Sequence, residues 1–177
     1  CFTNYIHSSD IHIFLKLSIG DPMLQLIREN TTKSSRLISY ASDMINKMSK
    51  NISTFPQDIR LLIKHFADLA PDESERLRRI EILFIDCLLV PAISNPKAYS
   101  ILPPSFSLNM SGGPSRSLHL LAKYVQLILH TKQATNRNID EEDIQSMQKI
   151  PFQDFLFQLI NIDETDLDVE GPSLILT

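Results

Sequence analysis

The residues of this chain that could take part in metal binding or catalysis are its histidines, its cysteines and an acidic stretch near the C-terminal end. The five histidines stand at positions 7, 12, 65, 119 and 130, and none pairs with a cysteine or glutamate at a spacing typical of a metal site. The stretch from Asp166 to Gly171 imitates the opening of a calcium loop, but Thr177 stands where such a loop needs glutamate. No glycine-rich phosphate loop and no nucleophile elbow occur either. The sequence therefore predicts no metal site and no cofactor.

Two cysteines, Cys1 and Cys87, cannot make a disulfide framework. Cys87 lies in an apolar helical stretch, where a thiol behaves as a small hydrophobe. A reducing, cytoplasmic setting fits this usage best. No run approaches the roughly 18 apolar residues that would cross a bilayer, so any membrane association is expected to be peripheral.

The net charge of −4 conceals an uneven distribution. Residues 1–137 carry 16 basic and 11 acidic side chains, whereas 138–177 carry one basic and 10 acidic. The small basic excess lacks interleaved aromatic residues that could stack bases, so nucleic-acid binding is not predicted. Because the first residue is Cys and not Met, we expect the chain to begin inside a larger protein. We divide it into a helical domain, 1–137, and an acidic helical extension, 138–177.

The segment 83–96, LFIDCLLVPAISNP, joins an apolar helix to a turn bracketed by two prolines. Proline has no amide hydrogen, and its ring clashes with the preceding helical turn. We therefore expect Pro91 to end the helix and Pro96 to keep it from resuming. A structural helix stop would explain the prolines alone, whereas a partner-binding surface would explain the rigid turn between them.

Apolar side chains recur at helical spacing, and four glycines with no tryptophan argue against an all-β fold. The sequence therefore predicts an all-α bundle, with 72–90 at its centre because the second half of that helix is apolar on nearly every side. We expect 34–52 and 56–69 to pair as an antiparallel hairpin. The remaining expected helices are 10–18, one starting at Asp21, 118–131, 140–147 and 152–160. The core-facing stripe of 56–69 is expected to contain Ile59, Leu62, Ile63, Phe66 and Leu69.

Three groups of residues follow one another in an order that resembles the C-terminal half of a Ras GTPase-activating (Ras-GAP) domain. The groups are Phe55-Pro56 with Arg60, the turn of Pro91, Ala92, Ile93 and Pro96, and Lys123 with Gln126. The likeness extends over 21–131. It implies a helical bundle that corresponds to the C-terminal part of such a domain, with a small GTPase of Ras or Rab type as its partner.

Within that superfamily, 13–26, the Phe55-Pro56 helix and Cys87 resemble endocytic proteins that combine a Ras-GAP domain with a Rab guanine-nucleotide exchange domain. This implies a regulator of GTPase signalling in endocytosis and vesicle trafficking. Such a protein would be cytoplasmic and peripheral on endosomal membranes through its other parts. Any exchange activity would belong to another domain.

The resemblance also assigns roles to single residues. It gives Phe55, Pro56 and Arg60 structural roles, and makes GTPase contacts of Pro91, Ala92, Ile93, Pro96, Lys123, Gln126 and His130. From the residues alone, Lys123 is either a solvated surface charge or a contact to an acidic partner, and Arg60 could pair with a nearby carboxylate. Arg76, Arg78 and Arg79 beside Glu73 and Glu75 predict a solvated face with ion pairs.

The departures from the family pattern concern activation. Cys87 stands where the family's Phe-Leu-Arg motif has the arginine that braces the arginine-finger loop, and a thiol cannot replace the directional bonds of a guanidinium. Val90 and His130 stand at positions where the family has asparagine. The finger, which is worth about 10³ to 10⁵ in rate, is expected upstream of Cys1.

We therefore expect GTPase activation by this chain to be weakened or absent, and any catalysis to belong to the partner GTPase, so the chain is not itself an enzyme. The alternative is a finger-less scaffold or effector that binds a GTPase without activating it. A third possibility is an intramolecular helical module that binds no GTPase.

Overall fold

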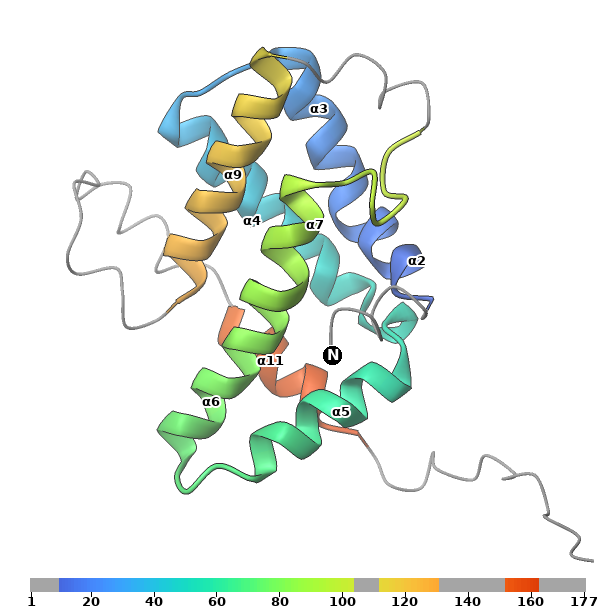
Figure 1. Ribbon diagram of the computed structural model, residues 1–177, viewed down its shortest axis with the longest axis vertical. Helices are drawn as coiled ribbons and strands as arrows, with labels where there is room; N and C mark the ends of the chain where they lie inside the picture. The colour runs from blue at the N-terminus through green and yellow to red at the C-terminus, as the bar shows by residue number, and fades with distance from the viewer. Residues whose placement is uncertain (1–9, 104–111, 131–151, 163–177) are drawn as a thin grey trace, which may run out of the picture.

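The computed structural model describes residues 10–103, 112–130 and 152–162, and these ranges contain helices and turns but no strand. The predicted all-α fold is confirmed. Figure 1 shows the helices arranged around one long helix that runs from α6 into α7. In chain order the elements are α2 (Ile11–Leu15), η1 (Lys16–Gly20), α3 (Asp21–Glu29), α4 (Ser34–Lys50), η2 (Ile52–Thr54), α5 (Gln57–Asp68), α6 (Glu73–Glu81), η3 (Ile82–Leu89), α7 (Val90–Ser94), α9 (Gly113–Leu129) and α11 (Phe152–Ile160).

The first helix is continuous, because the π-helical segment η1 joins α2 to α3 without a break. The prediction of two separate short helices is therefore wrong. Pro22 lies in the first turn of α3, directly after η1. A π-helix bonds residue i to residue i+5, so its turns are wider than those of an α-helix. The wider turn moves away the carbonyl that the proline ring would otherwise strike, and the helix continues through Pro22.

The same arrangement takes the central helix through Pro91. The π-helical segment η3 connects α6 to α7, and the N–H of Val90 donates to the carbonyl of Ile85, five residues back. The prediction that Pro91 ends the helix is wrong, because the π spacing accommodates its ring. The helix ends at Ser94, after which the N–H of Asn95 donates to the Pro91 carbonyl, and Pro96 lies in the turn that follows.

A chain of aromatic rings joins the parts of the bundle through its core. The ring centroid of Phe14, in α2, lies 4.7 Å from that of Phe55, which lies 6.2 Å from Phe84 of η3. Phe84 in turn lies 5.1 Å from Phe155 of α11. All four rings are buried, and each such pair contributes about 0.5–1.5 kcal/mol beyond its burial. The central helix thus lies in the core, as its apolar pattern predicts.

α11 belongs to the range expected to form an acidic extension, yet it packs against α5 and α4 and buries Phe155, Leu156 and Leu159. The described part of that range therefore shares the core of the bundle. The boundary at 137/138, the helix expected at 140–147 and the stretch 166–171 lie outside the described residues.

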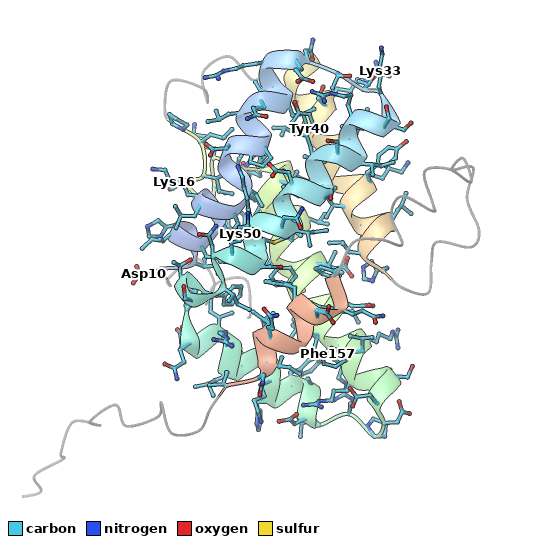
Figure 2. The ribbon with its side chains drawn as sticks, turned by 180° about the vertical axis from the view of Figure 1, so that it is seen from behind. Asp10, Lys16, Lys33, Tyr40, Lys50 and Phe157 are labelled. Atoms are coloured by element: carbon cyan, nitrogen blue, oxygen red, sulfur yellow. The ribbon has the colours of Figure 1, made fainter. Side chains whose placement is uncertain are left out.

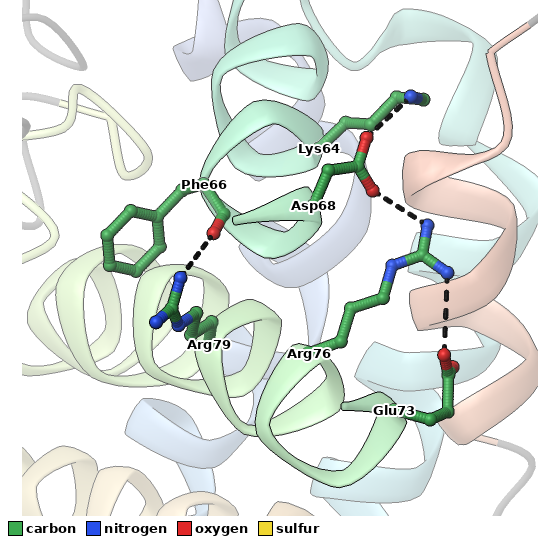
Figure 3. A network of polar contacts seen from close by, with 6 residues as sticks. All are labelled: Lys64, Phe66, Asp68, Glu73, Arg76 and Arg79. Atoms are coloured by element: carbon green, nitrogen blue, oxygen red, sulfur yellow. Dashed lines mark hydrogen bonds and ion pairs between the residues drawn. The ribbon is translucent and has the colours of Figure 1, made fainter. Parts of the chain in front are cut away.

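α5 packs mainly against α6, whereas α4 packs mainly against α9 and η1, so the predicted α4–α5 hairpin is not the principal pairing. Figure 3 shows polar contacts across α5 and α6: Arg76 pairs with Asp68 at 3.0 Å and with Glu73 at 3.6 Å, and Lys64 pairs with Asp68 at 2.7 Å. The ion pairs predicted for Arg76, Arg78 and Arg79 with Glu73 or Glu75 are confirmed, but only Arg78 is exposed, whereas Arg76 and Arg79 are half-buried. Exposed pairs of this kind each contribute about 0.2–1 kcal/mol.

The apolar stripe predicted for α5 is only partly correct. Ile59 and Ile63 are fully buried, but Leu62, Phe66 and Leu69 are 39%, 41% and 62% exposed. The face that the neighbouring helices cover is narrower than the predicted stripe and follows a strict four-residue spacing through Ala67. The guanidinium of Arg79 lies 5.2 Å from the centre of the Phe66 ring and shields part of it.

The side of the molecule opposite to the view of Figure 1 carries both charged and apolar side chains. Figure 2 shows Lys16, Lys33 and Lys50 projecting outward, and Phe157 of α11 is exposed on the same side. Among the described residues, no helix has both the length and the apolar character needed to cross a membrane.

Candidate functional site

α7 and α9 lie side by side (Figure 1), and an open pocket of about 460 Å³ lies between them. Two residues of the predicted site, Lys123 and Gln126, line this pocket. Sequence reasoning missed Ser94 because it placed the helix end at Pro91. It also missed His119, although His119 precedes Lys123 by four residues and so shares its helical face. The full lining is Val90, Ser94, His119, Ala122, Lys123, Gln126 and Leu127.

Lys123 is the exposed cation of this pocket. In the described part of the chain no carboxylate pairs with it. The apolar residues Val90, Ala122 and Leu127 line the same pocket, together with the polar Ser94, His119 and Gln126. The pocket therefore offers a partner a positive charge beside apolar area, which suits an acidic side chain flanked by hydrophobic ones.

A part-buried polar cluster that includes Gln126 joins α9 to the central helix. Gln126 Nε2 donates to Asp86 Oδ1 at 2.9 Å, and Nε2 of His130 lies 2.9 Å from the same oxygen. The other ring nitrogen of His130, Nδ1, lies 3.5 Å from Glu81 Oε2. Hydrogen bonding to Glu81, with a further contribution from Asp86, raises the pKa of His130 against the opposing effect of burial. His130 is buried, is not among the residues that line the pocket, and contacts the two carboxylates.

The turn residues do not all reach the surface. Ala92 and Ile93 are fully buried, Pro96 is buried and Pro91 is half-buried. Because the helix continues through Pro91, the side chains of Ala92 and Ile93 pack into the core. The predicted contact role for these two side chains does not fit their burial. Their packing fixes the position of the helix from which Val90 and Ser94 line the pocket.

Cys87 is half-buried on η3, next to Asp86. Burial, together with the charge of Asp86, raises the pKa of the Cys87 thiol. Its thiol is therefore neutral at physiological pH and is a weak hydrogen-bond donor. This side chain cannot provide the several charged, directional bonds of an arginine at this position.

Arg60 of α5 holds the C-terminal end of α11. Its Nε donates to the Leu159 carbonyl at 2.8 Å, and its Nη2 donates to the carbonyls of Gln158 at 2.7 Å and Asn161 at 3.2 Å. The last carbonyls of a helix lack partners within the helix and favour a cation. The structure thus gives Arg60 a structural role, with backbone carbonyls as partners. Phe55 lies in the aromatic chain and Pro56 immediately precedes α5.

No set of three or more His, Cys, Asp or Glu side chains in the described ranges has an arrangement that could hold a metal ion.

The family model for GTPase-activator proteins of Ras-like GTPases matches residues 7–130 of the chain, well over half of its length. The matched range includes the pocket, the polar cluster and both π-helical segments. No curated protein and no solved structure matches the chain.

Proposed function

The chain belongs to the family of GTPase-activator proteins for Ras-like GTPases, and on this premise we propose that the pocket between α7 and α9 receives a small GTPase of Ras or Rab type. The observation that carries the proposal is the exposed Lys123 beside apolar side chains, with no carboxylate partner among the described residues. An acidic segment of the GTPase would pair with Lys123, and Gln126 would offer its amide to the same segment.

We propose further that the chain activates its GTPase weakly or not at all. Cys87 supports this, because its neutral thiol cannot brace an arginine-finger loop as a guanidinium does. No arginine is found among the residues that line the described pocket, so a finger would have to come from elsewhere. Hydrolysis of GTP would be the chemistry of the partner, and the chain would be a regulator and not an enzyme.

The likeness of 13–26, Phe55-Pro56 and Cys87 to endocytic Ras-GAP proteins supports a finer proposal. The parent protein would regulate GTPase signalling in endocytosis and vesicle trafficking, in the cytoplasm and at the surface of endosomal membranes. A guanine-nucleotide exchange domain would lie elsewhere in that protein.

The second candidate function is a scaffold or effector that binds a GTPase without activating it. Cys87 is also the observation that favours this function, because loss of the bracing side chain affects catalysis more than it affects binding.

Binding is tested with the 177-residue chain and a panel of Ras- and Rab-type GTPases, each loaded with a non-hydrolysable GTP analogue, by biolayer interferometry. Lys123→Ala should weaken the affinity about tenfold or more, because loss of a partly desolvated interface charge costs at least about 1.4 kcal/mol. The matched control is Lys33→Ala, which removes an exposed lysine outside the pocket and should leave the affinity unchanged. Absence of binding across the panel, or equal losses in both variants, would rule the pocket out.

Activation is tested by measuring GTP turnover of each GTPase that binds, with the full protein in its native and Cys87→Arg forms. Acceleration that appears only with arginine would identify the thiol as the cause of weak activation. Binding without any change of turnover in either form would favour the scaffold.

A further inference from the structure

The polar cluster of Glu81, Asp86, Gln126 and His130 has a geometry that a charged histidine satisfies with both of its ring nitrogens. Both ring nitrogens of His130 face carboxylate oxygens, Nε2 toward Asp86 at 2.9 Å and Nδ1 toward Glu81 at 3.5 Å. A neutral imidazole has one N–H and one lone pair, so it could donate to only one of the two carboxylates. A protonated ring donates to both. His130 is 9% and Glu81 5% exposed, so little water reaches the contact between them, whereas the Asp86 side chain is 33% exposed.

The π-helical segment η3 is what places the two carboxylates together. Glu81 and Asp86 are five residues apart, and in an α-helix that spacing rotates two side chains apart by about 140°. In a π-helix, residues i and i+5 are joined by the backbone hydrogen bonds and lie on one side. The bond from Val90 N–H to the Ile85 carbonyl has this spacing. The widened turn therefore directs Glu81 and Asp86 toward the same imidazole.

The helix on the other side adds to the preference for a cation. His130 directly follows the last residue of α9, and its N–H donates to the Gln126 carbonyl at 3.3 Å. The C-terminal end of a helix attracts positive charge. Among the described residues, the charged groups acting on the ring are Glu81 and Asp86 of the central helix, and none comes from α3 or α4, which also pack on α9. Lys123 lies on α9 itself, two turns away.

Gln126 connects this cluster to the pocket. Asp86 Oδ1 accepts from both His130 and Gln126, and the carboxylate can only accept, so the amide nitrogen of Gln126 must face it. That orientation leaves the amide oxygen of Gln126 as an acceptor for a partner. If Asp86 rotated away, its carboxylate would no longer hold the Gln126 amide in that orientation.

We propose that His130 is a positioning residue for the pocket: its protonated ring holds Glu81 and Asp86, and Asp86 in turn fixes the amide of Gln126 in the orientation offered to a partner. A neutral ring has one N–H for the two carboxylates; when that N–H faces Glu81, the lone pair of Nε2 faces Asp86 and turns this carboxylate away from Gln126. The effect on partner binding rests on the proposed function, whereas the effect on Gln126 does not.

The sign of the pH dependence follows from the direction of the shift. The contacts with Glu81 and Asp86 raise the pKa of His130 in the folded chain. Their contribution to stability and to the orientation of Gln126 is therefore complete below about pH 6.5, the ordinary value for histidine, and is lost as the pH rises through the raised value.

The test that needs no partner is NMR of the chain between pH 5 and pH 9. The His130 ring signals, assigned with His130→Gln, should titrate with a midpoint above the ordinary value, and the side-chain amide signals of Gln126 should shift with the same midpoint. Asp86→Asn should lower the midpoint and uncouple the amide signals from it. A midpoint at or below the ordinary value, or Gln126 signals that ignore it, would overturn the proposal.

The test with a partner uses the GTPase that binds in the panel. Its affinity should fall about fivefold or more between pH 6 and pH 9, a typical size for coupling between two sites, and GTPase binding should in return raise the His130 midpoint. His65→Gln, which removes an exposed imidazole outside the pocket, should keep this pH dependence, whereas His130→Gln should abolish it. The same pH dependence in His130→Gln would overturn the proposal. If no GTPase binds at any pH, the proposed function fails, and the Gln126 signals alone decide the present proposal.

Discussion

Replacement of Arg60 by alanine should loosen α11 from the bundle. Arg60 makes two hydrogen bonds to the last carbonyls of α11 and a third to the carbonyl of Asn161, the residue after the helix, and the bond to Leu159 is part-buried. A hydrogen bond from a charged donor in such a place contributes about 1.5–3 kcal/mol. The bonds to Gln158 and Asn161 are exposed and compete with water, so we assign about 0.5 kcal/mol to each. The expected loss of unfolding free energy is about 2.5–4 kcal/mol.

Thermal and urea unfolding of the chain measure this loss. For a domain of this size, it corresponds to a fall in Tm of about 5–15 °C. Hydrogen exchange locates the effect: amides of α11 should lose protection while those of α4 keep theirs. Arg60→Lys retains the charge but not the forked geometry, so its loss should be smaller than that of the alanine variant.

Arg78→Ala is the matched control, because Arg78 is 63% exposed and pairs with Glu75 at 3.3 Å on the surface. Its removal should change the unfolding free energy by less than about 0.5 kcal/mol. Equal effects of the Arg60 and Arg78 substitutions, or unchanged protection of α11 in Arg60→Ala, would refute the view that Arg60 holds this helix.

Three further predictions concern the core, the thiol and the proline. Phe155→Ala should lower the unfolding free energy in urea by about 3–5 kcal/mol, whereas Phe157→Ala on the same helix, where the ring is 43% exposed, should cost far less; similar costs would contradict the packing. In a Cys1→Ser background at pH 7.5, iodoacetamide should react with Cys87 more slowly than it reacts with free glutathione, because burial and the charge of Asp86 raise the pKa of this thiol above its ordinary 9.0. Asp86→Asn should speed the reaction, and rapid labelling of Cys87 in the native chain would contradict this view. Pro91→Ala restores an N–H and should let η3 adopt α-helical spacing. This spacing would turn Asp86 away from Glu81 and so lower the NMR titration midpoint of His130. An unchanged midpoint would show that the proline does not determine the arrangement of the cluster.

Helices were predicted well where a start signal and a periodic apolar face agreed. Asp72 shows why: its carboxylate accepts from the Glu75 N–H at 2.8 Å, and α6 begins at the next residue. These contacts are local, so the sequence determines them without knowledge of the rest of the fold. The family resemblance likewise identified Lys123 and Gln126 as contact residues, and both line the same pocket.

Predictions failed at the two prolines because the rule applied to them assumes α-helical geometry. Pro22 and Pro91 each follow a π-helical segment, which has no separate signal in the residue pattern. The cluster of Glu81, Asp86 and His130 was not predicted for the same reason, since two side chains five residues apart lie on one side of a helix only when the turn is widened. The exposure of Phe66 depended on which helix packs beside α5, which is a property of the whole fold.

The π-helical segment η3 also has a consequence for comparing this chain with its relatives. Each of its hydrogen-bonded rings encloses one residue more than an α-helical ring, so η3 has the spacing expected of a helix that carries an inserted residue. A relative with a straight α-helix here should align with a one-residue gap between Ile82 and Leu89. Such a relative should also lack the proline equivalent to Pro91, because the narrower turn would not accommodate its ring. The inserted residue and the proline are thus expected to be gained or lost together.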